Sequence, residues 1–419
     1  MDYSSASASG SPKPPGSSVH YGWHIVWVGT LCVFASLGLG RFALGMILPG
    51  LGASLSLTYA QMGLVGTMNF TGYLAAVLFC GPMAERMGYR LLITLALILT
   101  GSTMILMSLS SSLTLILVLY TLCGMGIGAA NVPMMGLISH WFSRSRRGRA
   151  TGFVVIGSGF AILFSGKLIP FLNDLTEPDL GWRLSWQVLG GIILCIAMLC
   201  LALLRNDPRE KGLCPVGYEQ ETDLSLPDLE ENRITAKIVA HLGAVYFLFG
   251  FSYVIYATFI VTTLINEHGF ATATAGNFWA MVGLLSLLSG PVFGTLSDRI
   301  GRNITLGLVF AIQTVSYLLV AVQPAPALLL FSVSCFGLVA WSIPSIMAAM
   351  VGDYAGPFKA ARIFGLVTFF FAIGQIAGPV AAGALAEKSG SFSGSFLMAG
   401  LCALSGVFLS LRLKPAGRG

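Results

Sequence analysis

The chain has 419 residues, of which 55% are hydrophobic and only 10% charged, and its mean hydropathy is +0.83. Because a soluble protein carries about 25% charged residues, this composition indicates an integral membrane protein. The net charge of +6 forms no basic cluster interleaved with aromatics, which excludes nucleic acid as a partner, and the eight scattered cysteines, with no C-x-x-C pair, indicate neither a metal site nor a disulfide framework.

Twelve long apolar runs follow one another along the chain, each close to the roughly 20 residues that a membrane-spanning helix needs. They are preceded by residues 1–20, which are rich in Ser, Pro and Gly and are expected to be a disordered tail. The fold class is therefore an all-α membrane protein with twelve transmembrane helices. The expected spans are residues 23–48, 60–81, 91–109, 113–140, 149–172, 186–204, 237–265, 273–295, 304–322, 326–350, 360–385 and 392–412.

The distribution of Lys and Arg predicts the orientation of these spans. With the N-terminus inside, the cytoplasmic segments hold 19 of the 23 basic residues, and the outer segments hold only Arg183 and Lys388. Such an excess marks the cytoplasmic side of a membrane protein. We therefore expect a multi-pass protein of the cell (inner) membrane, surrounded by the lipid bilayer, with both termini in the cytoplasm.

One polar turn occurs twice between apolar runs. Residues Gly81–Arg90 and Gly294–Asn303 share the form Gly-x-x-x-acid-Arg-x-Gly at an offset of 213 residues. A turn repeated at equivalent places predicts two pseudo-symmetric six-helix bundles. We expect the bundles at residues 21–204 and 237–412, with a cytoplasmic linker at 205–236 and a cytoplasmic tail at 413–419.

The charged residues of the two turns are candidates for gating. Glu85 and Asp298 lie just before the next helix, where a carboxylate meets the positive end of that helix. Arg86 and Arg299 follow them and can pair with the carboxylate or with lipid phosphates. The alternative is that these charges only set the topology.

The paired turns resemble the most specific sequence mark of the major facilitator superfamily, and the resemblance covers nearly the whole chain. The segments Tyr21-Gly-Trp-His-Ile-Val, Gly181-Trp-Arg and Asp207–Gly217 resemble those of bacterial relatives of the monocarboxylate transporters and oxalate/formate exchangers. The resemblance implies two halves that alternate in access, with the turn residues latching the cytoplasmic side. Two positions depart from the pattern: Tyr120 stands where many members have Arg, and residues 277–296 lack the Arg that the exchangers carry in helix 8.

Two cations fall within expected spans. Arg41 lies eight residues before Pro49, roughly 12 Å from the outer end of its helix. A charge at this depth costs several kcal/mol unless it reaches water, a partner or a substrate, and no acidic residue within a span is available to pair with it. Arg41 is therefore the principal candidate for contact with an anionic substrate. Lys167, three residues before Pro170, is a second candidate; for both residues the alternative is snorkelling to the outer headgroups.

Uncharged polar and aromatic residues within the spans complete the candidate substrate site. Tyr120 and Asn131 are eleven residues apart and share one helix face, and Tyr253 and Tyr256 flank Val254, the residue equivalent to Arg41. Each of these side chains could instead pack or bond between helices. The full set is Asn69, Tyr120, Asn131, Tyr253, Tyr256, Trp341 and Gln375.

The sequence contains no G-x-x-x-x-G-K-[ST] loop, so a gradient rather than ATP has to drive transport. We expect a monomeric secondary active transporter that moves a small organic anion, a monocarboxylate, by alternating access. A co-transported proton would travel on the substrate, because no carboxylate lies deep in the membrane. No catalytic residue, cofactor or metal ion is expected. The alternatives are an exporter of a neutral or amphipathic compound and a non-transporting membrane sensor, for which the cytoplasmic segments are too short.

Overall fold

A computed structural model of the chain describes residues 20–177, 180–218, 235–322 and 325–413. Most of the two expected tails, and residues 219–234 of the expected linker, lie outside these ranges. The first group of helices comprises α1 (Tyr21–Val33), the π-helix η1 (Phe34–Phe42), α2 (Leu44–Ser54), α3 (Tyr59–Met87), α4 (Tyr89–Ser108), α5 (Leu113–Trp141), α6 (Arg144–Asp174) and α7 (Gly181–Leu203), with the short 3-10 helix η2 (Pro208–Lys211) after it. The second comprises α8 (Ala236–Asn266), α9 (Thr272–Ile300), α10 (Arg302–Ala321), α11 (Pro326–Val339), α12 (Ser342–Ser389) and α13 (Ser393–Arg412).

Twelve stretches within the described ranges are long and apolar enough to cross a membrane. The shortest have 20 residues, which at 1.5 Å per residue is about the 30 Å thickness of the hydrocarbon core. One stretch, Tyr21–Ser54, combines α1, η1 and α2, and α12 contributes to two, because its backbone leaves the helical conformation at Gly356. Each stretch overlaps one expected span, so the predicted twelve-helix architecture is confirmed.

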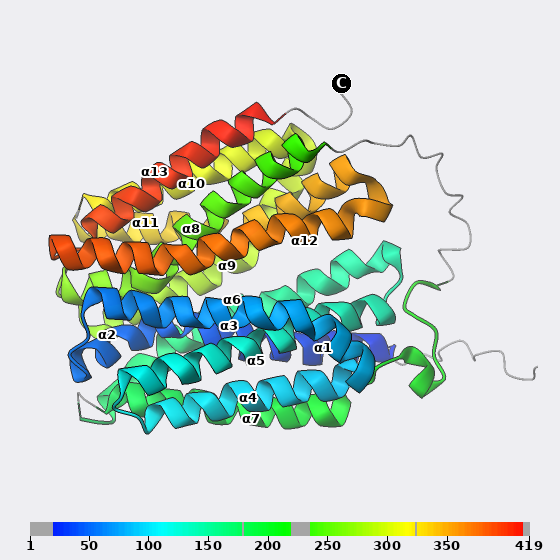
Figure 1. Cartoon of the computed structure of the whole chain (residues 1–419), viewed down its shortest axis with the longest axis horizontal. Coiled ribbons are helices and arrows are strands. Elements are labelled where there is room, and N and C mark those ends of the chain that lie inside the picture. The colour runs from blue at the N-terminus through cyan, green and yellow to red at the C-terminus, as the bar shows by residue number, and fades with distance from the viewer. Residues whose placement is uncertain (1–19, 178–179, 219–234, 323–324, 414–419) are drawn as a thin grey trace, which may run out of the picture.

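The helices form two groups that lie side by side. Figure 1 shows α1–α7, the N-terminal group, in one half of the molecule and α8–α13, the C-terminal group, in the other. The groups meet mainly where α2 contacts α8, α3 contacts α12 and α6 contacts α9. Any site shared by the two groups therefore lies among these helices and the broken first span.

Both repeated turns join their helices through a glycine with a positive φ angle. Gly88 separates α3 from α4 with a φ of 81°, and Gly301 separates α9 from α10 with a φ of 99°. A side chain would strain the backbone at these angles, which explains a glycine at the last position of the repeat. We call the end of the molecule that carries these turns the turn end, and the opposite end the far end.

The ion pairs at the second turn differ from the simplest expectation. Asp298 forms an ion pair with Arg302, in the first turn of α10, and Arg302 Nε also lies 3.1 Å from Asp353 Oδ2 on α12. Among the described residues, Arg299 forms no ion pair, and neither do Glu85 and Arg86 of the first repeated turn, between α3 and α4. The acid of the second turn is therefore tied to α10 and α12 through Arg302, which follows the last glycine of the shared pattern.

Candidate substrate site between the two groups of helices

Arg41 lies inside the protein, on the π-helical segment of the first span. The segment η1 ends at Phe42, one residue after Arg41, and only 7% of the Arg41 surface is exposed. π-Helical turns are rare and concentrate at functional sites, because the extra residue re-aims the side chains around it. The position matches the expectation of an intramembrane arginine, and its burial does not match snorkelling to the headgroups.

The guanidinium of Arg41 is held by an amide and two aromatic faces. Its Nε donates to Asn69 Oδ1 at 3.2 Å, and its central carbon lies 4.5 Å from the ring centre of Phe70 and 4.3 Å from that of Tyr73. Its Nη2 is buried without a hydrogen-bond partner, and no carboxylate pairs with it in the described part of the chain. The cation is thus positioned by neutral groups, and the N–H donors of Nη2 are left for another molecule.

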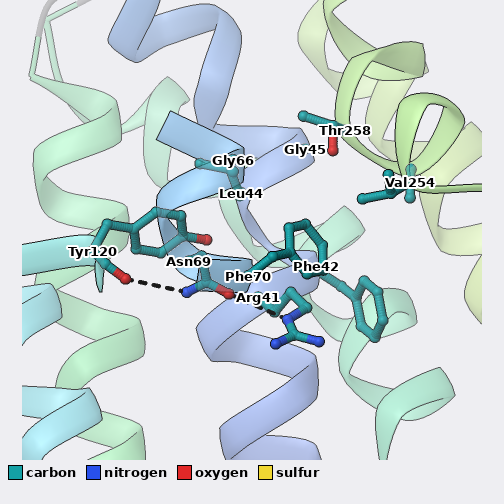
Figure 2. A pocket seen from close by; sticks show the side chains of 11 residues that line it. Arg41, Phe42, Leu44, Gly45, Gly66, Asn69, Phe70, Tyr120, Val254 and Thr258 are labelled. Carbon is teal, nitrogen blue, oxygen red and sulfur yellow. Dashed lines mark hydrogen bonds between the residues drawn. The ribbon is translucent and has the colours of Figure 1, made fainter. Parts of the chain in front are cut away.

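The side chains around Arg41 are themselves held by hydrogen bonds. Asn69 Nδ2 donates to the Tyr120 carbonyl at 3.5 Å (Figure 2). The Tyr120 hydroxyl donates to the Gly40 carbonyl at 3.2 Å. Asn131 lies one step away, where its Nδ2 donates to the Tyr73 hydroxyl at 3.3 Å. Of the predicted residues, Asn69 therefore contacts Arg41 directly, Tyr120 bonds to Asn69 and lines the same pocket, and Asn131 supports the Tyr73 ring that covers Arg41.

The C-terminal group completes the pocket around Arg41. Val254, Ala257 and Thr258 of α8 line it opposite Arg41, and its volume is about 20 Å³, room for roughly one water molecule. Arg41 and Val254, which the repeat places at equivalent positions, thus line one pocket from opposite groups (Figure 2). None of the residues that line it is acidic.

Three further predicted residues gather beside this pocket. The Gln375 amide donates to the Tyr253 hydroxyl, and the Tyr253 ring lies 6.2 Å from the ring of Trp341. Trp341 in turn lies 4.9 Å from the ring of Phe42. The indole nitrogen of Trp341 is buried without a partner. Through Trp341, the C-terminal group therefore contacts Phe42, the residue that follows Arg41.

Two predicted residues lie elsewhere. The Tyr256 hydroxyl bonds to Ser332 Oγ at 2.9 Å and its ring stacks on Phe336 at 4.3 Å, so this side chain belongs to the packing inside the C-terminal group. Lys167 is exposed and its Nζ donates to Asn277 Oδ1 at 2.5 Å. It therefore joins α6 to α9, and neither Lys167 nor Tyr256 is among the residues that line the Arg41 pocket.

The far end of the interface between the groups is tightly packed. A Cβ on Gly63 of α3 would come within 2.3 Å of the Pro379 carbonyl oxygen on α12, and Thr67 Oγ1 donates to the Ile376 carbonyl at 2.9 Å. A Cβ on Gly45 of α2 would come within 2.8 Å of the Ala257 carbonyl. The Arg41 pocket is therefore closed towards the far end by backbone-to-backbone contact.

The turn end of the interface is open by comparison. A Cβ on Gly283 would meet the Gly159 carbonyl at 2.7 Å, so α6 and α9 touch there, whereas a Cβ on Gly152 or Gly294, nearer the turns, would meet nothing within 4 Å. Between these helices and the start of α12 lies a cleft of about 1120 Å³. Its lining runs from Asp298, in the second repeated turn, to Trp341, in the middle of the Pro326–Gly356 span.

Sequence reasoning missed the two rings that hold the Arg41 cation. Phe70 and Tyr73 follow Asn69 by one and four residues on α3, and a helix brings positions one turn apart onto one face. The spacing of Tyr73 from the predicted Asn69 was a usable signal. Within the described ranges, no three His, Cys, Asp or Glu side chains gather closely enough to hold a metal ion.

The chain is similar to transport proteins over nearly its whole length. It is 24% identical over 412 residues to the probable sulfoacetate transporter SauU of Cupriavidus necator, covering 93% of each chain, and 28% identical over 430 residues to monocarboxylate transporter 11 of Mus musculus, covering 97% of this chain and 90% of that one. The crystal structure of the nucleoside transporter NupG superimposes with a TM-score of 0.71 at 14% identity, over 94% of this chain and 100% of that one. Residues 33–411 match the family described as "Uncharacterised MFS-type transporter YbfB". The chain belongs to this family and is a secondary transporter of the major facilitator superfamily.

Proposed function

We propose that this transporter carries a small organic anion with a carboxylate group, and that Arg41 is its principal charge contact. The observation that carries the proposal is the guanidinium itself, which is buried, has one terminal nitrogen without a hydrogen-bond partner and lacks a carboxylate partner in the described part of the chain. Guanidinium binds carboxylate through two parallel hydrogen bonds. A monocarboxylate would supply the missing counter-charge and accept from Nη2.

The relatives support an anionic substrate. One is described as a probable sulfoacetate transporter and another as a monocarboxylate transporter, and sulfoacetate and monocarboxylates are anions. No acidic side chain lines the Arg41 pocket, so a proton that accompanies the anion would be carried on the substrate itself.

The proposal includes a topology and a cycle. The 19-to-2 distribution of basic residues supports a turn end and both termini on the cytoplasmic side of the cell (inner) membrane. Residues 21–204 and 237–412 would act as two rigid bundles, joined by residues 205–236, that rock about the Arg41 pocket in a monomer. The packed far end and the open cleft at the turn end are the arrangement that a cytoplasm-facing state would have.

A pair of near-isosteric probes tests the need for charge. The purified transporter in proteoliposomes is offered radiolabelled propionate or propionamide, which differ chiefly in the negative charge. We expect saturable uptake of the carboxylate and none of the amide. Uptake of the amide at an equal rate would contradict the proposal.

The same assay addresses a second candidate function, export of a neutral or amphipathic compound. The observation in its favour is the cleft of about 1120 Å³, which is large enough for a drug-sized molecule. Its lining includes the apolar side chains of Phe153, Val155 and Ile156. Such a transporter would take up or expel neutral aromatic compounds without competition from carboxylates.

A further inference from the structure

Two aromatic rings, one from each group of helices, stand between the Arg41 pocket and the turn-end cleft. Phe42 lines the pocket and Trp341 lines the cleft. Their ring centres are 4.9 Å apart with an angle of 47° between the planes, which is direct contact. Side chains that line different cavities and touch each other form the wall that separates those cavities.

The wall has to open for any solute to reach Arg41 from the cleft. The pocket holds about 20 Å³, room for roughly one water molecule, whereas the cleft holds about 1120 Å³. The far end is closed by contacts between backbones, as at Gly63 and Gly45. Separation of two side chains disturbs far less structure than separation of packed backbones, so the turn-end wall is the more easily opened of the two.

Trp341 lies at a break between two helices. α11 ends at Val339 and α12 begins at Ser342, and Trp341 itself has φ −113° and ψ 11°. Pro344 has no N–H to donate to the carbonyl of Ala340, so the helical hydrogen-bond ladder is interrupted at this point. Rotation about residues 340–341 would move Trp341 away from Phe42 without unfolding either helix.

Two buried serines hold this break in place. The backbone N–H of Trp341 donates to Ser289 Oγ on α9 at 3.0 Å, and Ser289 Oγ lies 2.7 Å from Ser342 Oγ. Ser342 Oγ is also 3.1 Å from the Ser289 carbonyl, and both serines are fully buried. The hydroxyl of Ser289 thus supplies a partner for a backbone N–H that the break leaves outside the helix.

We propose that Phe42 and Trp341 form a gate between the cleft and the Arg41 pocket, hinged at residues 340–341 and held closed by Ser289. The proposal concerns access to the pocket and holds for any substrate. It is therefore independent of the assignment of an organic anion.

Access to the pocket is measurable without a substrate. Val254 lines the pocket and is 1% exposed, so Val254→Cys places a thiol behind the gate. A membrane-impermeant methanethiosulfonate reagent is applied to one side of membrane vesicles at a time, and modification of the peptide that contains residue 254 is followed by mass spectrometry. Arg209→Cys, at a side chain that is 94% exposed beside the turn end, identifies which side is which.

If the gate exists, the rate at which Val254→Cys is labelled from the turn end should depend on the residue at the gate. Adding Trp341→Ala to Val254→Cys should accelerate labelling by about tenfold, because an aromatic contact is lost and a passage is left, whereas Trp341→Phe should keep it within about twofold. Ser289→Ala should accelerate labelling by a smaller factor, since it removes only the hinge contact. Phe153→Ala, which enlarges the cleft away from the gate, is the matched control and should change nothing.

Equal labelling rates with and without Trp341→Ala would overturn the proposal, as would an acceleration by Phe153→Ala as large as that by Trp341→Ala. If Trp341→Ala does not fold, Ser289→Ala carries the test, and an unchanged labelling rate in that variant refutes the gate. Acceleration from the far end alone would also refute it.

Discussion

Replacing Arg41 with Gln removes a buried charge that no carboxylate neutralises among the described residues. An Arg at the centre of a membrane helix costs about 2.5–3.5 kcal/mol on insertion scales. Against this stand two contacts of the cation with rings, each about 0.5–1 kcal/mol, and a hydrogen bond to Asn69 that Gln can still form. The free energy of unfolding should therefore stay equal or rise, whereas loss of one partner of a buried ion pair would lower it by about 3–5 kcal/mol.

Transport should respond in the opposite way. Loss of a buried charge partner in recognition costs about 2–5 kcal/mol, which corresponds to between about thirtyfold and a few thousandfold in kcat/KM. Arg41→Lys should fall between Gln and the native residue, because it keeps the charge but not the paired donors. The assay is propionate uptake into proteoliposomes together with the melting temperature of the purified protein.

The matched control is Arg209→Gln, which removes the same charge from a side chain that is 94% exposed and should leave both measurements unchanged. Unchanged uptake by Arg41→Gln would refute the reasoning. A fall in melting temperature of many degrees together with the fall in uptake would show instead that Arg41 is structural.

Two further predictions follow from packing. Tyr256→Phe loses the bond to Ser332 and should lower the free energy of unfolding by about 1 kcal/mol, measured by denaturation, with uptake within about twofold of native; a large loss of uptake would place this residue at the substrate. Gly63→Ala puts a methyl group about 2.3 Å from the Pro379 carbonyl of the closed far end, so it should favour opening there and accelerate labelling of Thr258→Cys from the far end; an unchanged rate would mean that the helices shift to accept the methyl group.

The architecture was predictable because its signals are local. Apolar runs of membrane length predicted all twelve spans, and the last glycine of each repeated turn, Gly88 and Gly301, has a positive φ. The same repeat placed Val254 opposite Arg41, and both line one pocket. Neither result required knowledge of how the groups pack.

Parts of the site were not predictable because they depend on packing. Tyr253 and Tyr256 are one helical turn apart on α8, yet the first bonds to Gln375 beside the pocket and the second to Ser332 inside the C-terminal group. The expected partner of Asp298 was Arg299, whereas its partner is Arg302 at the start of α10, which also lies beside Asp353 on α12. The π-helix that carries Arg41 is likewise a property of the packed structure.

The central claim, that Arg41 binds the carboxylate of a small organic anion, is tested most directly by ligand stabilisation of native protein and Arg41→Gln in parallel. A carboxylate at 100 times its dissociation constant should stabilise the native transporter by about 2.7 kcal/mol, seen as a rise in melting temperature, and leave the variant unaffected. Equal stabilisation of both proteins by the carboxylate, or stabilisation of the native protein by neutral compounds alone, would contradict it.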